Sequence, residues 1–501
     1  MFIFDTIYFL LGLIGVFSFS VMAKSIKVNF IYNLINTISG LLFPVITFPY
    51  ASRILLEDGI GQIQFYNSII NYIILLTGIG IPIYAVREIA RVRDNKKLLS
   101  QTTVEIILLN LFFNVLGYIA VAFLCFFVDR LQENVSVFLL LSLSIVLTTI
   151  GCPWFYKGVE DFKYVTLRGL AVKSVCVLIL FLLVKTREDL IWYALYTVLV
   201  SVGNYILNFI RLRKYIDVKS FLIKEINIWR HIKPSLAVFM FSLITSIYLN
   251  LDTVMLGFLK DDANVGYYTA ATKLSHVIVM IVTSLGGVML PRLSNLIKNN
   301  KTDEFFKLAQ KSYHFVLLVS FPICAGVFIM ASPMIMLFSG KTFLPAVYTL
   351  QIISPIIVFI GISNLIGMQV LYPLGKIGLV TLSTFIGAVI NFTLNCILIP
   401  TYAQDGAAFA TVTAEFGVTL SQLYIVKNYI PFRLFDKKVV LYFFSSVLMF
   451  FVCNLFLNLH YSESVNMIFV PILGTIVYAA ILMIMRDSQI RDIINIVKRK
   501  K

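Results

Sequence analysis

Two charged residues, Asp252 and Lys273, lie inside long apolar segments on opposite sides of a short polar loop at 260–262. In α-helices, which rise about 1.5 Å per residue, both would reach the same depth, roughly 9 Å below one face of a membrane. An ionised side chain in hydrocarbon is costly, so it usually faces a partner, a cavity or a substrate path. The pair therefore predicts either a static ion pair or a polar switch beside a route through a membrane.

Basic side chains within the apolar segments would suit an anionic ligand. Lys173 lies too deep in its segment to reach the headgroups easily, so it either lines a binding site or pairs with a buried acid. Arg168, one turn into the same segment, either extends toward lipid headgroups or contacts the ligand. Lys273 either contacts the ligand or bridges to Asp252. Three arginines at segment ends either anchor helices in the interface or complete the anion site: Arg53, Arg87 and Arg292.

Acidic and histidine side chains in the same segments are candidates for coupling to an ion or a proton. Glu415 lies near the middle of its segment, where it either takes part in coupling or fixes a helix contact. His276 lies one turn beyond Lys273 on the same helix face. With Asp252 they form the predicted coupling or switching group. Glu105 lies near the end of its segment, which favours a structural role.

The composition indicates a membrane protein, so the residues named above would be positioned by membrane-spanning elements. The chain of 501 residues is 59% hydrophobic and only 13% charged, with a mean hydropathy of +0.91. Apolar runs long enough to cross ~30 Å of hydrocarbon recur along it, and a lipid-exposed backbone must be helical or form a closed barrel. We therefore predict an all-α polytopic membrane protein with about fourteen spans: 29–51, 63–86, 103–128, 135–156, 164–184, 190–210, 234–258, 267–290, 313–338, 345–371, 376–399, 407–427, 438–459 and 465–485.

The distribution of charge predicts the orientation. The net charge is +16, and most of the 41 lysines and arginines fall on one set of alternate loops, beginning with the side of Lys24 and Lys27. By the positive-inside rule, both ends of the fourteen-span unit are cytoplasmic. The basic tail at 498–501 is expected to meet anionic lipid headgroups. This asymmetry explains the positive charge through membrane lipids as partners, and no nucleic-acid partner is expected.

The chain lacks the sequence signatures of several functional classes. The six cysteines lie scattered in apolar segments, without the paired spacing of zinc sites or disulfides. No Gly-rich phosphate loop, HExxH or GxSxG motif is present, so we expect no nucleotide hydrolysis, no metal and no cofactor. A polysaccharide polymerase or ligase would need a large catalytic loop outside the membrane, and the predicted outer loops are short. The chain is therefore not expected to be an enzyme.

An internal duplication with a period of about 205 residues divides the chain. Gly61 matches Gly266, Arg87 matches Arg292, and the Ile-Lys pair at 26–27 matches the pair at 232–233. Six spans separate the copies, so both enter from the same side, as in secondary transporters whose site lies between parallel repeats. The predicted units are a six-helix lobe at 22–215, a second at 216–430, helices 13 and 14 at 431–485, and a tail at 486–501. Residues 1–21 form a hydrophobic extension of doubtful status.

Several motifs resemble those of a known family. They lie at 44–53, 154–160, 252–257, 265–268, 374–376 and 391–415. Together they resemble the O-antigen and capsule repeat-unit flippases of the multidrug/oligosaccharidyl-lipid/polysaccharide exporter superfamily. Within the last motif, Asn391 and Asn395 lie one helical turn apart, which favours interhelical hydrogen bonds over sugar recognition.

The resemblance implies a specific cargo. Members of that flippase family have two six-helix lobes plus two further helices. They move undecaprenyl-diphosphate-linked oligosaccharide to the outer leaflet of the bacterial cytoplasmic membrane. A polysaccharide polymerase and chain-length proteins are possible partners. Two alternatives within the superfamily are a drug/cation antiporter, which would favour an acidic cavity, and a lipid II flippase, whose cargo has the same diphosphate but a different head.

Overall fold

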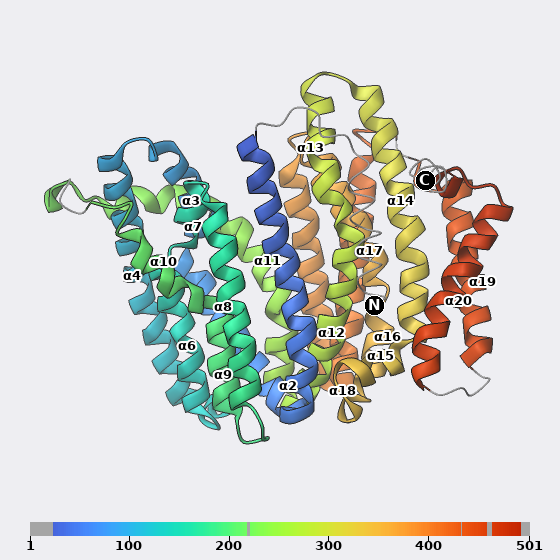
Figure 1. Cartoon of the computed structure of the whole chain (residues 1–501), viewed down its shortest axis with the longest axis horizontal. Helices are drawn as coiled ribbons and strands as arrows, with labels where there is room; N and C mark the ends of the chain where they lie inside the picture. Colours follow the sequence, from blue (N-terminus) through green and yellow to red (C-terminus); the bar gives the residue numbers. More distant parts are fainter. Residues whose placement is uncertain (1–23, 218–220, 432, 458–462, 492–501) are drawn as a thin grey trace.

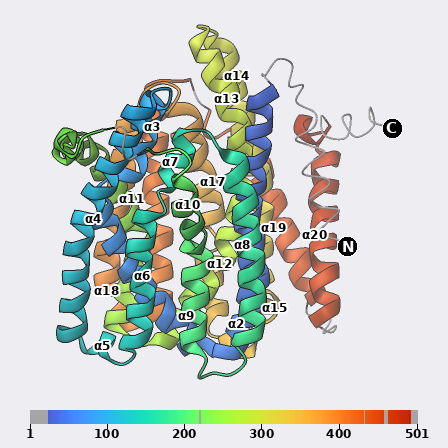
Figure 2. The same cartoon turned by 60° about the vertical axis from the view of Figure 1, so that its left-hand side comes forward.

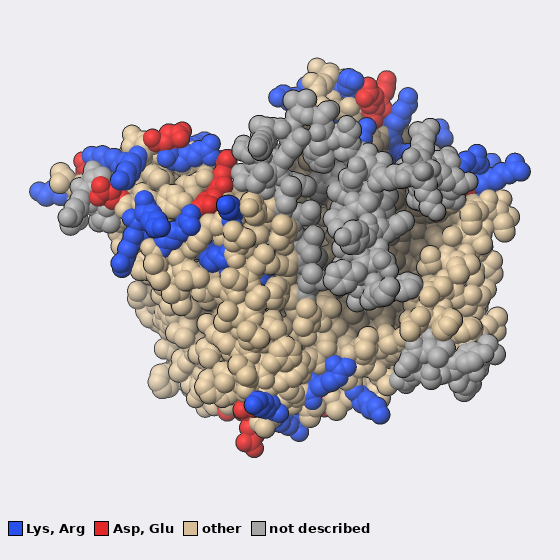
Figure 3. Space-filling view, viewed as in Figure 1, with Lys and Arg blue, Asp and Glu red and all other residues tan. Residues whose placement is uncertain are grey.

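The computed structural model describes residues 24–217, 221–431, 433–457 and 463–491. Within these ranges every regular element is a helix, and the long helices run side by side (Figure 1). Charged side chains gather at the two ends of the helices, and an apolar belt lies between them (Figure 3). This arrangement confirms the all-helical membrane fold. The extension at 1–21 and the basic tail at 498–501 lie outside the described residues.

The first half of the chain begins with a long helix and continues through shorter ones. Its elements are α2 (Lys24–Gly78), α3 (Ile81–Val92), α4 (Lys96–Phe127), α5 (Asp129–Gln132), α6 (Val135–Ile150), α7 (Pro153–Gly158), α8 (Phe162–Leu183), α9 (Leu190–Val198), η1 (Leu199–Gly203) and α10 (Asn204–Leu212). The short turns η3 (Ile223–Glu225) and η4 (Ile228–His231) connect it to the second half.

The second half repeats this succession and adds a C-terminal pair of helices. Its elements are α11 (Ile232–Leu259), α12 (Asp262–Thr283), α13 (Leu285–Lys298), α14 (Thr302–Ile329), α15 (Ala331–Phe338), η5 (Lys341–Phe343), α16 (Ala346–Ile353), α17 (Ile356–Asn364), η6 (Leu365–Leu371), α18 (Ile377–Val426), α19 (Lys437–Leu457) and α20 (Glu463–Ile484). The pair α19–α20 packs against α14, where the Tyr478 hydroxyl donates to the Leu318 carbonyl at 3.0 Å.

The helices α2 and α18 each contain a sharp break. Leu56 in α2 has φ 59° and Ala403 in α18 has φ 48°, both outside the helical region. A straight helix of 50 residues would be about 75 Å long, far beyond one hydrocarbon core. Asn395 and Thr411 lie on opposite sides of Ala403, yet both hydrogen-bond to Asp252. The two parts of α18 therefore lie side by side as a hairpin of two spans.

The helices fit the predicted spans in length and composition. Among the described residues, ten helices are long and apolar enough to cross a membrane, or eleven if the bent pair Phe43–Gly78 and Ile81–Val92 is one span. The broken helix α18 supplies two of the fourteen predicted segments, 376–399 and 407–427. In Figure 1, α3–α10 lie on one side and α12–α18 on the other, with α2 and α11 between them. The exact count of fourteen and the lobe boundaries stay predictions.

The loops predicted on opposite membrane faces lie at opposite ends of the bundle. We call one end the α3 face, where α3 and the α13–α14 connection lie, and the other the α5 face (Figures 1 and 2). The α11–α12 connection belongs to the α5 face, because Arg130 of α5 forms an ion pair with Asp262 at 3.0 Å. The start of α2 and the connection before α11 lie at the α3 face, so both repeats enter from one side.

We predict that the α3 face is cytoplasmic. Single cysteines at 91–97, 221–224 and 298–307 should be protected from a membrane-impermeant thiol reagent in intact cells, whereas cysteines at 129–134 and 260–264 should react. The physical reason is the excess of basic residues in the α3-face loops. Labelling in opened cells provides the control for reagent access. Protection of a cysteine at position 261 in intact cells but not in opened cells would contradict the assignment.

Candidate functional site

The carboxylate of Asp252 lies at the centre of a buried polar cluster. Its Oδ1 accepts hydrogen bonds from Asn391 Nδ2 at 2.9 Å and Asn395 Nδ2 at 2.6 Å. Its Oδ2 accepts from Thr411 Oγ1 at 2.6 Å and from the Tyr268 hydroxyl. The Asp252 side chain therefore joins α11, α12 and both parts of α18. The asparagines act as interhelical donors, in keeping with the prediction from their spacing.

Lys273 forms no salt bridge with Asp252 in the described structure, so the alternative of a static ion pair is not observed in this conformation. The Lys273 ammonium lies 4.7 Å from the ring centroid of Phe48 in α2. Within the described residues, no salt bridge includes either Lys273 or Asp252. The expectation of equal depth is also wrong, because α12 begins at Asp262, five residues before its predicted start. Lys273 therefore lies about 7 Å beyond Tyr268, the residue that meets Asp252, and points about 140° away from it around the helix.

Lys173 approaches the same helix from the first half of the chain. Its Nζ donates to Ser39 Oγ at 3.2 Å and lies 5.8 Å from the Phe43 ring centroid. The described structure contains no carboxylate partner for Lys173, so the alternative of a pair with a buried acid is not observed. Lys173 on α8 and Lys273 on α12 thus both contact the first part of α2, at levels separated by nine residues, or roughly 14 Å.

The four predicted arginines occupy separate places. Arg53 is exposed and donates to three main-chain carbonyls, those of Pro49, Met336 and Leu337. These bonds tie α2 to the C-terminal end of α15 at the α5 face. Arg87 and Arg292, the pair matched by the duplication, are exposed on α3 and α13 near the opposite face. Arg168 is buried near the start of α8. The structure therefore does not gather these arginines around one ligand.

The remaining candidates for coupling differ in their surroundings. Glu415 is buried in the second part of α18, one turn after Thr411 and so on the same face. It lies close in depth to the Asp252 cluster. His276 is exposed on α12, and within the described residues its ring makes no hydrogen bond. The coupling role of Glu415 stays a prediction, and the packing gives His276 no defined role.

The Asp252 cluster has the composition of a site for a proton or a small monovalent cation. A carboxylate, a threonine hydroxyl and two carboxamides, whose oxygens could replace their nitrogens by rotation, are hard oxygen ligands. Oδ1 of Asn395 is already buried without a hydrogen-bond partner. The described residues contain no group of three or more His, Cys, Asp or Glu that could hold a metal ion.

The two halves of the chain cross very closely at the α5 face. A Cβ added to Gly61 would overlap the carbonyl oxygen of Asp262 and lie 2.8 Å from the Gly266 nitrogen. A Cβ added to Gly266 would overlap the carbonyl oxygen of Glu57. The contact is reciprocal, because Gly61 corresponds to Gly266 and Glu57 to Asp262 in the duplication. Glycine is required at both positions because only hydrogen fits between the two backbones.

Polar contacts reinforce this crossing. Arg130 of α5 forms its ion pair with Asp262 and also donates to the Gly257 carbonyl at 3.2 Å. Both partners in the ion pair are largely shielded from solvent, so the interaction is less screened than a surface pair. With the bonds of Arg53, these contacts close the α5 face between the two halves in this conformation.

At the α3 face, Glu105 binds the connection between the halves. Its fully buried carboxylate accepts from Arg230 at 2.6 Å, His231 Nε2 at 2.9 Å and the Asn227 amide at 2.8 Å. Burial lowers the pKa of His231 despite the opposing carboxylate, so the neutral ring donates to Glu105 from Nε2 and accepts from the Tyr84 hydroxyl at Nδ1. The predicted structural role of Glu105 agrees with these contacts.

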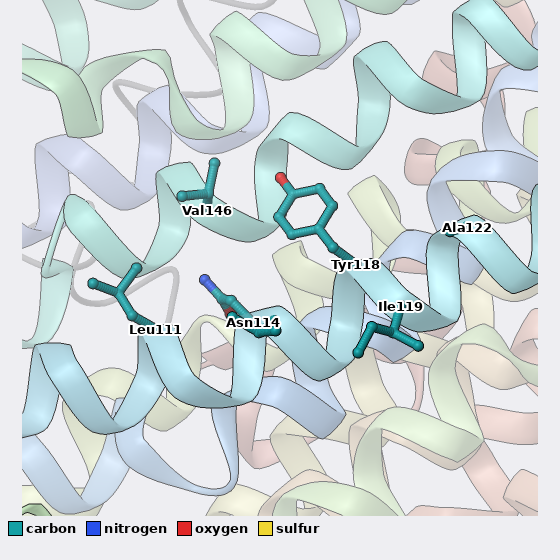
Figure 4. Close-up of a pocket in the computed structure, with 7 residues that line it drawn as sticks. Leu111, Asn114, Tyr118, Ile119, Ala122 and Val146 are labelled. Carbon is teal, nitrogen blue, oxygen red and sulfur yellow. The ribbon is translucent and has the colours of Figure 1, made fainter.

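One open groove lies away from all of these charges. It is formed by α4 and α6, has a volume of about 470 Å³ and is lined mainly by apolar side chains such as Leu111, Ile119 and Val146 (Figure 4). Asn114 faces it and donates to Thr149 Oγ1 at 2.9 Å. Its apolar lining suits hydrocarbon rather than a charged group.

Comparison with known proteins identifies the family. The model of the polysaccharide biosynthesis protein family matches residues 26–297, more than half of the chain. The chain belongs to this family. A second model, named MatE, matches residues 237–397. The resemblance inferred from the motifs is confirmed, and the protein is a multi-pass membrane protein.

Individual relatives extend the match. An Escherichia coli K12 protein named as an O-antigen transporter is 23% identical over 407 residues, which cover 81% of this chain and 97% of the relative. The structure is similar to the lipid II flippase MurJ in an inward closed conformation, with a TM-score of 0.68, 19% identity and coverage of 93% and 100%. It is also similar to an inward-facing MATE family multidrug transporter, with a TM-score of 0.62, 13% identity and coverage of 78% and 94%. The two solved structures show the fold.

Sequence reasoning missed two features of this family member. Tyr268 and Thr411 were not predicted as partners of Asp252. Asn395 and Thr411 lie eight residues before and after Ala403, the middle of the connection predicted between the spans 376–399 and 407–427. This symmetry places the two residues at one depth and could have identified them as partners. Gly61 and Gly266 were matched by the duplication, but their contact was not foreseen.

We predict that Gly61→Ala lowers the apparent melting temperature of the purified protein by several degrees. The added methyl group overlaps the Asp262 carbonyl, and overpacking of this kind costs about 1–3 kcal/mol. Gly326→Ala is the matched control, since its Cβ meets nothing within 4 Å and alanine favours a helix. Equal melting temperatures for the two variants would show that the close crossing is not present in the resting protein.

Proposed function

We propose that this protein moves undecaprenyl-diphosphate-linked oligosaccharide repeat units across the bacterial cytoplasmic membrane by alternating access, for O-antigen, capsule or exopolysaccharide synthesis. The observation that carries the proposal is the family match over residues 26–297, together with an O-antigen transporter relative aligned over 81% of the chain. Both ends of the helical unit are assigned to the cytoplasm. A polysaccharide polymerase and chain-length proteins are the partners that would take over the cargo.

The two membrane-embedded lysines support an anionic cargo. Moving a diphosphate through hydrocarbon would cost tens of kcal/mol, so a carrier must offer it a polar, cationic surface. Lys173 and Lys273 approach one helix, α2, from the two halves of the chain, and in the described structure neither is neutralised by a carboxylate. We assign them to the diphosphate. The prenyl tail stays in lipid while the sugar head crosses.

The Asp252 cluster supports coupling to an ion gradient. Protonation or cation binding at Asp252 would change its hydrogen bonds to Asn391, Asn395, Thr411 and Tyr268 at once. Because these residues belong to α12 and both parts of α18, occupancy would alter how α11 packs in the second half. A ligand shifts a conformational equilibrium only by binding the two states differently, and such a change supplies that difference.

The closed α5 face defines the step that coupling must drive. With the α3 face assigned to the cytoplasm, the crossing at Gly61 and Gly266 seals the outer side of this conformation. Release of cargo outward requires these backbones to separate and the Arg130–Asp262 ion pair to open. Energy for that step would come from the ion or proton gradient.

Two alternatives belong to the same superfamily. A drug/cation antiporter would carry acids in its cavity, whereas the deep charged groups that contact α2 here are both lysines. A lipid II flippase shares the diphosphate chemistry, and the similarity to MurJ shows a common fold. The O-antigen transporter relative favours a polysaccharide repeat unit over lipid II.

We predict that Lys173→Gln and Lys273→Gln each lower polymer export about tenfold or more at unchanged membrane abundance. A charge-assisted hydrogen bond contributes about 1.5–3 kcal/mol, and 1.4 kcal/mol corresponds to a factor of ten. The arginine variants should keep much of the activity. Export is measured in cells whose only copy is the variant, with Lys214→Gln as the control for an exposed lysine. Equal polymer export by the Gln and Arg variants would show that the lysine at that position does not bind the diphosphate.

We predict that Asp252→Asn abolishes the response of transport to an imposed gradient. Asparagine preserves size but cannot take up a proton or offer a negative charge to a cation. The measurement compares cargo transport into proteoliposomes under a sodium gradient and under a proton gradient, where the wild type should respond to one of them. Asp261→Asn is the matched control, because Asp261 is an N-cap at the α5 face and asparagine also caps helices. A full response by Asp252→Asn would exclude Asp252 from coupling.

A further inference from the structure

Arg168 is a buried cation whose hydrogen-bonding capacity is largely unused. It lies near the start of α8, and only 9% of its surface is exposed. Its Nε and Nη1 atoms are buried and have no hydrogen-bond partner in the structure. Within the described residues, Arg168 also forms no salt bridge. A buried charge of this kind is strongly unfavourable unless an opposite charge reaches it.

A second arginine lies beside the same aromatic ring. The guanidinium carbon of Arg168 lies 5.0 Å from the Tyr164 ring centroid, and that of Arg211 on α10 lies 3.8 Å from it. Nε of Arg211 is likewise buried without a hydrogen-bond partner. Two guanidinium groups thus lie beside Tyr164, and three of their nitrogen atoms are buried donors without an acceptor.

One carboxylate does not neutralise this cluster. Asp161 Oδ2 accepts from Arg211 Nη2 at 2.7 Å and from the Tyr215 hydroxyl at 2.9 Å. Its Oδ1 accepts from the Tyr164 amide at 3.4 Å. Both oxygens of Asp161 are therefore occupied, and one positive charge remains, with its buried donors on Arg168.

The cluster of Arg168, Arg211 and Tyr164 lies near the membrane interface at the α3 face. α8 begins at Phe162, so the Cα of Arg168 lies about 9 Å from the helix start at the α3 face. Helical side chains tilt toward the N-terminus, which returns the guanidinium to the level of Tyr164, one turn nearer that face. Figure 2 shows α8 and α10 as neighbours at this side of the bundle. Arg211 keeps 33% of its side chain exposed, which leaves access from outside.

We propose that Arg168, Arg211 and Tyr164 form a binding site for the phosphate group of an anionic phospholipid in the leaflet at the α3 face. The planar guanidinium fork matches phosphate oxygens in pairs, and the unused donors supply those bonds. The site lies away from Lys173, which contacts α2 deeper in the same helix. It does not depend on the proposed transport function, because it concerns a resident lipid rather than the cargo.

The test compares the apparent melting temperature of purified full-length protein in micelles supplemented with phosphatidylglycerol, phosphatidylcholine or undecaprenyl diphosphate. Wild type should gain several degrees with phosphatidylglycerol and little with phosphatidylcholine. Arg168→Met, which keeps the packing and removes the charge, should lose this gain. Without anionic lipid, it should be at least as stable as wild type, because no charge is left buried.

Arg213→Gln is the matched control, an exposed arginine two residues beyond Arg211, and it should respond to phosphatidylglycerol like wild type. Native mass spectrometry should show phosphatidylglycerol retained by wild type and by Arg213→Gln but not by Arg168→Met. An equal rise in melting temperature with phosphatidylglycerol for wild type and Arg168→Met would overturn the proposed phosphate site. A gain with undecaprenyl diphosphate but not with phosphatidylglycerol would overturn the assignment to a bilayer lipid and place cargo phosphate at Arg168.

Discussion

The burial of the Asp252 carboxylate constrains the packing of the whole second half of the chain. A charge in this position is tolerated only if its oxygens accept hydrogen bonds, and four side chains provide them. Those donors come from α12 and from both parts of α18, so the hairpin of α18 must close against α11 at this depth. Loss of one donor leaves the charge short of a partner. The cluster therefore fixes the helix arrangement and also makes it sensitive to any change in the charge of Asp252.

The reciprocal glycine contact joins this second half to the first. Gly61 meets the backbone of Asp262, and Gly266 meets the backbone of Glu57, as expected where two copies of one motif cross at an axis between them. No side chain mediates the crossing, so no rotamer change can loosen it gradually. The two halves must either lie in contact or separate as units. This property suits a protein that alternates between two states, since packed interfaces of this kind are bistable rather than continuously deformable.

The positive charges within the membrane fall into groups with different physical settings. Lys173 and Lys273 contact aromatic rings and a hydroxyl on α2. Arg168 is packed near the interface, with donors in a fixed fork that suits a long-lived phosphate contact. Arg53 instead donates to main-chain carbonyls and holds α2 against α15.

The sequence by itself determined the all-helical membrane class and the positions of the apolar segments, because hydropathy varies along one dimension. The duplication stays a prediction. The rise per residue gave only an approximate depth for each buried charge, because α12 begins five residues before its predicted start. The sequence could not determine which side chains meet at a given depth. Asp252 lies seven residues before the end of α11, whereas Lys273 lies eleven residues after the start of α12, so their levels differ by about 6 Å. Asp252 faces α18 and Lys273 faces α2. That choice depends on the rotation and packing of each helix, which only the tertiary structure decides.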